Sequence, residues 1–116
     1  MSNEFPFTIE TFLGQCGGSK EVGNMILDAF LEQVETDTHE MESCLASGDL
    51  AQVGKVGHRL KGTAGVLGAS NLFSLCLALE TAGKAENAEE ANKLYPKIKA
   101  EVSRCVAAVP ETRTRL

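Results

Sequence analysis

The chain has 116 residues, of which 43% are hydrophobic, 23% are charged and only 5% are aromatic, with no tryptophan. This length allows one domain with a single core, and the scarcity of aromatic residues favours a core of aliphatic side chains between helices. The formal net charge of -5 excludes nucleic-acid binding through a basic surface, and no apolar run is long enough to span a membrane.

The first ten residues, MSNEFPFTIE, contain neither the basic nor the apolar segment of a secretory signal, so we expect a cytoplasmic protein. The four cysteines lie in four different predicted segments and form no C-x-x-C pair: Cys16, Cys44, Cys76 and Cys105. We therefore expect free, mostly buried thiols and no metal site.

The spacing of apolar and turn residues predicts a first, short helix from about Thr8, a candidate N-cap, to Gln15, before Gly17-Gly18. A long helix follows, capped by Ser19 and running to about Ala46. Its apolar positions recur mostly at spacings of three and four: Val22, Ile26, Ala29, Phe30, Val34, Met41, Cys44 and Leu45.

Asp37 interrupts this pattern, because it lies three residues after Val34 and four before Met41. Two interpretations are open. Either the apolar stripe drifts around the long helix through Leu27 and Leu31 and leaves Asp37 at its edge, or Asp37 is a functional carboxylate. We favour the first, because the sequence shows no partner for the carboxylate.

The Gly48-Asp49 turn separates the second helix from the third. Glycine suits the left-handed position after a helix, and Asp49–Gln52 has the form of a capping box. The third helix is therefore predicted from about Asp49 to Leu67-Gly68. Helical geometry places its apolar residues on one side: Leu50, Val53, Leu60, Ala64 and Leu67.

The fourth helix is predicted from an N-cap at Ser70 to Gly83, and a second capping box, Asn87–Glu90, opens the fifth. Their apolar positions are Leu72, Leu75, Cys76, Leu79 and Ala82, then Ala91, Leu94, Ile98, Val102, Cys105 and Val109. Pro96 is expected to kink the fifth helix or to mark the first turn of its longer part, and Pro110 with the tail ETRTRL is expected to fray.

Short connections between amphipathic helices predict antiparallel neighbours and an up-down helical bundle. The chain therefore reads as one domain over residues 1–116, with its core over about 7–109 and a frayed C-terminal tail over 110–116.

His58 is predicted to lie about 135° from the middle of the apolar side of the third helix, and thus to be exposed. Lys61 and Gly62 are its neighbours at i+3 and i+4, with Gly54 one turn back and Gly65 beyond. Glycines let another molecule approach the ring, and the ammonium group of Lys61 can neutralise an anion held there. These surroundings suit a phosphoryl transfer from a large partner, although the spacing alone leaves open a solvent-facing histidine in a glycine-loosened helix.

The segment His58–Gly62, with the sequence HRLKG, is followed by Gly68 and by Leu79-Glu80. This combination resembles the signature of histidine-containing phosphotransfer (HPt) domains of multistep phosphorelays. The turn before the histidine helix and the five-helix layout extend the resemblance over most of the chain. It implies an all-α fold, an antiparallel up-down four-helix bundle with an additional short N-terminal helix.

By this resemblance, His58 is the residue that accepts the phosphoryl group, and Lys61 is the cation beside that group. Gly62 is the gap next to the ring, and Gly68 serves the turn after the helix. Glu80 lies where the family often places Glu or Gln near the histidine, and would orient the ring.

The resemblance also implies a function as a phosphorelay intermediate. The chain would accept a phosphoryl group from an aspartyl phosphate on one receiver domain, of a hybrid sensor kinase or a response regulator, and pass it to the aspartate of another. The receiver would hold the Mg²⁺ that this chemistry needs, so no cofactor or metal is expected in this chain. Without a Walker-type or kinase glycine loop, we expect a phosphoryl carrier and not an ATP-binding autokinase.

Lys55, Arg59 and Lys61 form, with the histidine, a basic patch that is complementary to the aspartate pocket of a receiver domain. We expect Lys55 and Arg59 to contact the partner, together with Gly54 and Gly65. The partner is a protein and not a nucleic acid or a membrane, and we expect the chain itself to be a monomer.

Gly57 departs from the family pattern, in which alanine commonly precedes the histidine, and this departure concerns the rigidity of the helix. The other histidine, His39, is expected to be solvated on the polar side of the second helix. Two other functions are left open: an adaptor bundle that docks receiver domains without accepting phosphate, and a structural bundle with an incidental histidine. Two origins are also left open, a free-standing protein and a domain excised from a hybrid kinase, and Met1 directly before the domain favours the first.

Overall fold

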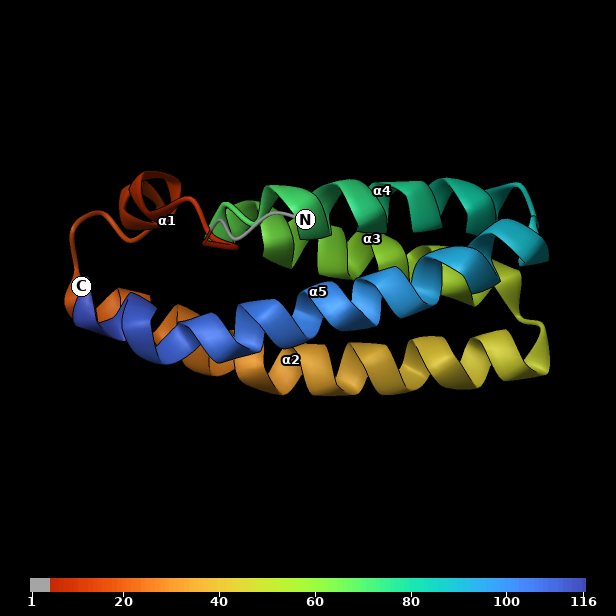
Figure 1. Ribbon diagram of the computed structural model, residues 1–116, viewed down its shortest axis with the longest axis horizontal. Helices are drawn as coiled ribbons and strands as arrows, with labels where there is room; N and C mark the ends of the chain where they lie inside the picture. The colour runs from red at the N-terminus through yellow and green to blue at the C-terminus, as the bar shows by residue number, and fades with distance from the viewer. Residues whose placement is uncertain (1–4) are drawn as a thin grey trace.

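The computed structural model describes residues 5–116, which form five helices and no strand (Figure 1). The helices are α1 (Ile9–Gln15), α2 (Lys20–Ser47), α3 (Leu50–Leu67), α4 (Ser70–Lys84) and α5 (Ala88–Thr114). The four long helices pack in the cyclic order α2, α3, α4, α5, each antiparallel to the next, while α1 lies at one end beside α3. The expected up-down four-helix bundle with a short N-terminal helix is confirmed.

Local sequence signals determine most helix ends. Three side chains accept a hydrogen bond from the backbone N–H three residues later: Ser19 (3.1 Å), Asp49 (3.2 Å) and Asn87 (3.1 Å). Gly48 and Gly68 end α2 and α3 with φ angles of 77° and 67°, where glycine avoids the strain of a side chain. The expectation that Ser70 caps α4 is wrong, because Ala69 occupies the N-cap position and Ser70 is the first helical residue.

The expectation of a frayed tail over residues 110–116 is also wrong, because α5 continues through Pro110. Thr112 is fully buried. Arg113 donates to Asn24 at 2.7 Å and pairs with Asp28 at 2.5 Å, both on α2. Contacts with another helix therefore hold the last turn of α5 in place.

Pro96 and Pro110 both lie inside α5 and do not end it. Each proline lacks the N–H that would bond the carbonyl four residues earlier, at Asn92 and Val106. All four residues are exposed, so water can replace the missing donor at each carbonyl.

The buried side of α2 is rotated from the predicted one. Val22 is 40% exposed and Ala29 is exposed, whereas Leu27 is buried. The buried residues of α2 are Gly23, Leu27, Phe30, Val34, Asp37 and Met41. Asp37 therefore lies within the core stripe, and the prediction that it stays at the edge is wrong.

The other long helices bury the predicted stripes. Every predicted apolar position of α5 is buried, and so are all those of α3 and α4 except the half-buried Leu50 and Leu75. The four cysteines are free thiols, buried or, for Cys44, half-buried. Within residues 5–116, none of the helices carries an apolar stretch that would cross a membrane.

Candidate functional site

His58 lies on the exposed side of α3, as its position on the helix predicts, with 67% of its side chain accessible. Its ring nitrogen Nδ1 is 2.8 Å from Oε2 of Glu80, which projects from α4. Glu80 itself is buried, with only 6% of its side chain accessible. The site is therefore built by two neighbouring helices, with an open ring on one and a buried carboxylate on the other.

Glu80 is also bound by two lysines. Lys61 Nζ donates to Oε1 at 2.7 Å, and Lys84 Nζ lies 3.2 Å from Oε2. The hydrogen bond from Lys61 is the largest cause that lowers the pKa of Glu80 to about 2, and those from Lys84 and His58 add to it against the opposing effect of burial. The carboxylate is consequently ionised at neutral pH.

This ionised carboxylate decides which ring nitrogen of His58 carries the proton. A carboxylate can only accept hydrogen bonds, so Nδ1 must be the donor. In the neutral ring the lone pair then lies on Nε2, which Glu80 leaves free. The arrangement therefore presents a nucleophilic nitrogen on an exposed ring in a fixed orientation.

The glycines after His58 lie as the sequence predicts. A Cβ atom added at Gly62 would meet nothing within 4 Å, so this position is open. At Gly65 an added Cβ would lie 3.8 Å from the ring of Phe73, an ordinary contact distance. Gly68 forms the turn after α3, where its carbonyl accepts a hydrogen bond from the Thr8 N–H at 2.8 Å.

The glycines before His58 have a different role. Gly54 and Gly57 are buried against α4: their added Cβ atoms would lie 3.4 Å from the carbonyl oxygen of Glu80 and 3.2 Å from its nitrogen. A Cβ atom added at Gly83, on α4, would lie closer still, at 2.6 Å from the Cα atom of Gly54. Gly54 therefore allows α3 and α4 to approach each other. It also lines the groove beside His58, and its contact with a partner stays a prediction.

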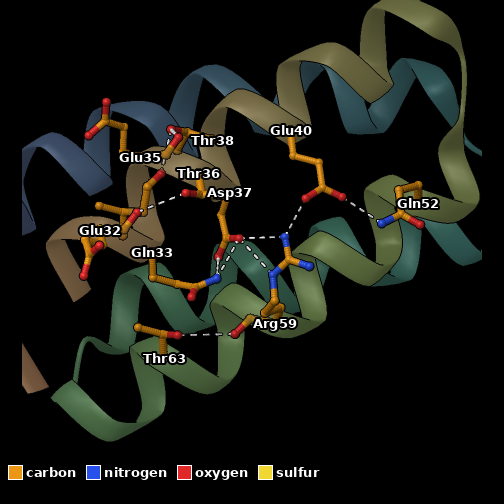
Figure 2. A network of polar contacts seen from close by, with 11 residues as sticks. Glu32, Gln33, Glu35, Thr36, Asp37, Thr38, Glu40, Gln52, Arg59 and Thr63 are labelled. Carbon is orange, nitrogen blue, oxygen red and sulfur yellow. Dashed lines mark hydrogen bonds and ion pairs between the residues drawn. The ribbon is translucent and has the colours of Figure 1, made fainter. Parts of the chain in front are cut away.

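The three basic residues of the expected patch, Lys55, Arg59 and Lys61, lie in three different environments. Lys55 is exposed and lines, with His58 and Lys84, a groove of about 730 Å³ between α3 and α4. Lys61 is bound to the buried carboxylate described above. Arg59 turns towards α2, where its guanidinium binds Asp37 and Glu40 (Figure 2). The guanidinium of Arg59 is therefore paired within the chain, with 42% of the side chain accessible, and its contact with a partner stays a prediction.

Sequence reasoning missed Lys84 and the pairing of Asp37. Lys84 follows Glu80 by four residues, a spacing at which opposite charges on a helix meet, so this signal was present in the sequence. Asp37 and Arg59 are 22 residues apart on different helices, and no local pattern joins them. His39 is exposed on α2, as expected, and does not belong to this site.

The part of the chain that the structure describes contains no group of three or more His, Cys, Asp or Glu side chains placed to hold a metal ion. The site around His58 contains one imidazole, the carboxylate of Glu80 and three lysines, and a second carboxylate, that of Glu86, lines the same groove. These groups can hold and compensate an anionic group on the ring.

Comparison with known proteins identifies the family. Residues 25–109 match the model of the Hpt domain. The chain is 28% identical over 74 residues to multistep phosphorelay regulator 1 of Schizosaccharomyces pombe (strain 972 / ATCC 24843); the match covers 64% of this chain but only 25% of that protein. The fold is similar to the crystal structure of histidine-containing phosphotransfer protein B (HptB) from Pseudomonas aeruginosa PAO1, with a TM-score of 0.88, 19% identity and 99% of both chains covered. The chain thus belongs to the Hpt domain family.

Proposed function

We propose that this chain carries a phosphoryl group on Nε2 of His58, accepting it from the aspartyl phosphate of one receiver domain and passing it to the aspartate of another. The observation that carries the proposal is the 2.8 Å bond between Nδ1 and the buried, ionised carboxylate of Glu80. This bond assigns the proton to Nδ1 and the lone pair to Nε2 on a ring that a partner can reach.

In the first step the lone pair of Nε2 attacks the phosphorus atom of the aspartyl phosphate. The N–P bond forms as the P–O bond to the aspartate breaks, and the aspartate carboxylate leaves with the electron pair. The imidazole ring becomes positively charged, and the carboxylate of Glu80 stabilises this charge through the Nδ1 hydrogen bond.

In the second step an aspartate oxygen of another receiver domain attacks the same phosphorus atom. The N–P bond breaks and its electron pair returns to Nε2, so the neutral ring is restored. Phosphoryl transfer depends mainly on positioning and charge compensation, and both can be supplied by a site without a nucleotide.

Three lysines compensate the negative charge of the phosphoryl group. Lys61 is only 20% exposed and bound to Oε1 of Glu80, whereas Lys84 is 75% exposed and paired with Oε2 of the same carboxylate. Lys55 lines the same groove as His58. We expect the Mg²⁺ of the reaction to be bound by the receiver domain, and the chain itself to act as a carrier that is not labelled by ATP.

The test uses the full chain and a receiver domain that carries a radiolabelled phosphoryl group on its aspartate. We expect an acid-labile, alkali-stable label on the chain, and its loss in His58→Gln. His39→Gln is the matched control, since His39 is the other of the two histidines and lies exposed on α2; this variant should keep the label.

Undiminished label in His58→Gln would exclude His58 as the acceptor. Binding of the receiver domain without label would identify the chain as a docking adaptor. Neither binding nor label would identify it as a structural bundle.

A further inference from the structure

Asp37 is a fully buried carboxylate that the proposed transfer does not use. Its Oδ1 atom is 2.8 Å from Nε of Arg59 and 2.7 Å from Nη2 (Figure 2). Gln33 Nε2 donates to both carboxylate oxygens at 2.9 Å. A buried charge is tolerated only when it is paired and hydrogen-bonded, and these contacts satisfy that condition.

The same network continues to the surface between α2 and α3. Arg59 Nη2 also donates to Oε1 of Glu40 at 2.8 Å, and Oε2 of Glu40 accepts from Gln52 Nε2 at 2.8 Å. Asp37 and Glu40 lie about one turn apart on α2, and Gln52 and Arg59 about two turns apart on α3. Side chains of α2 therefore hold α3 at two levels, and Arg59 binds both carboxylates.

Arg59 directly follows His58, and this places the network next to the reacting ring. At this turn α3 is bound by carboxylates from two helices: Asp37 of α2 binds Arg59, and Glu80 of α4 binds His58. Consecutive helical residues point about 100° apart. The two attachments thus act on different sides of α3, and together they fix its rotation about its own axis.

The helix around His58 is rich in glycine, at Gly54, Gly57 and Gly62, and glycine is the least favourable residue in a helix interior after proline. A rotation of about 10° moves an atom that lies about 6 Å from the helix axis by about 1 Å. A displacement of that size can slow a transfer by about a hundredfold. The rotation of α3 therefore matters for the rate.

We propose that Asp37 is a positioning residue for phosphoryl transfer: through Arg59 it fixes the rotation of α3 that presents His58 to the receiver domain. This inference rests on the proposed function. It gives the buried ion pair a role in the rate of transfer that is separate from its role in stability.

The double variant Asp37→Leu/Arg59→Met separates the two roles. Removal of Arg59 alone leaves the buried carboxylate of Asp37 without its charged partner, whereas replacement of both residues by apolar residues of similar volume is often neutral for stability. We expect the double variant to unfold near the wild-type temperature and to transfer the phosphoryl group about tenfold more slowly at saturating receiver. We also expect faster amide exchange at residues 57–61, and ring-nitrogen chemical shifts that report a mixture of His58 tautomers.

Asp28→Leu/Arg113→Met is the control for the loss of an ion pair of α2, although 68% of the Asp28 side chain is exposed. It removes another ion pair between an aspartate of α2 and an arginine, in this case of α5, far along α2 from Asp37. Its transfer rate, amide exchange at residues 57–61 and His58 ring shifts should equal those of the wild type.

Arg59→Lys is a second variant, which keeps the charge beside Asp37 but cannot reproduce the fork of the guanidinium that binds Asp37 and Glu40 together. We expect a transfer rate between those of the wild type and the double variant. It also provides the test if the double variant proves unstable.

Wild-type transfer rates in a folded double variant and in Arg59→Lys would overturn the inference and make the pair purely structural. If the double variant does not fold, a wild-type rate in Arg59→Lys alone overturns it. A wild-type chain that takes no label from the receiver would instead refute the proposed function, so the two failures are distinguishable.

Discussion

Gly62 is the residue at which the structure leaves room beside His58. It lies one helical turn after the histidine, it is exposed, and, apart from the two adjacent residues and the backbone of its own helix, no atom lies within 4 Å of the position that a Cβ would occupy. Packing within the chain therefore does not require a glycine at this position. The space is available to a partner that approaches the ring.

Substitutions at Gly62 should separate stability from transfer. Gly62→Ala should stabilise the chain by about 0.5–1 kcal/mol, because alanine favours an exposed helix. Gly62→Leu should also leave the fold intact but slow transfer more than alanine does, because the larger side chain stands where the receiver must come close. Thermal unfolding and the rate of label transfer measure the two effects. A Gly62→Leu chain that does not fold, or one that transfers at the wild-type rate, would contradict this account.

At the residue scale, the sequence predicts the parts of the site that lie on one helix. The exposure of His58 and its proximity to Lys61 and Gly62 follow from helical spacing. Glu80 was assigned only through the family resemblance, because it approaches from another helix. The Asp37–Arg59 pair could not be predicted at all, since only the packing of α2 against α3 brings these residues together.

At the element scale, the close approach of α3 and α4 makes the bond between His58 and Glu80 possible. An added Cβ at Gly83 would lie 2.6 Å from both the Cα and the N atom of Gly54, and 2.8 Å from the carbonyl oxygen of Leu50. These are backbone atoms, so no side-chain rotation could relieve the contact. The position of α4 beside the histidine helix thus depends on glycine at this crossing.

The loss of stability caused by alanine substitutions at these glycines should increase as the distances become shorter. Gly83→Ala should destabilise the chain by about 1–3 kcal/mol, the usual effect of overpacking, and should slow transfer by moving Glu80 away from His58. Gly57→Ala, with contacts of 3.2 and 3.3 Å, should have a smaller effect. Gly54→Ala, with contacts of 3.4 Å and more, should be tolerated and serves as the control. Denaturant unfolding measures the order of stability of the three variants, and equal stability of all three would contradict this prediction.

The sequence could not show that Gly54 and Gly57 face α4. Helix α3 is covered by α2 on one side and by α4 on another, so its buried surface is wider than its aliphatic stripe. Hydropathy marks the stripe through leucine and valine but gives no signal at a glycine. Helix ends were more predictable, because the caps at Asp49 and Asn87 are hydrogen bonds within a few residues.

At the scale of the whole molecule, the helical bundle could be predicted from the sequence, but the ordered last turn of α5 could not. The periodic apolar residues of α3, α4 and α5 and the short turns determine the number and direction of the helices. The last turn of α5 depends on buried Thr112 and on the bond between Arg113 and Asp28 of α2. These contacts join the C-terminal end of α5 to α2, and they override the local preference of Pro110 and a polar tail to fray.

The stability of the whole bundle should depend on Glu80 in a pH-dependent way. Its pKa is lowered from 4.5 to about 2 in the folded chain, mainly by Lys61. A carboxyl group with a lowered pKa stabilises the fold above its ordinary pKa, and this contribution is lost as the pH falls towards the folded-state value. The difference in unfolding temperature between the wild type and Glu80→Gln should therefore be constant above about pH 5 and shrink between pH 4.5 and pH 2. A difference that persists unchanged to pH 2 would contradict the assigned ion pairs.

The hydrogen bond between His58 and Glu80 also determines how many protons the ring binds during the proposed transfer. Because Nδ1 keeps its proton throughout, the ring contains the same number of protons before and after each transfer. The phosphoryl group can then change carriers without any exchange of protons with water. Uptake or release of a proton by the ring therefore favours neither direction of the transfer.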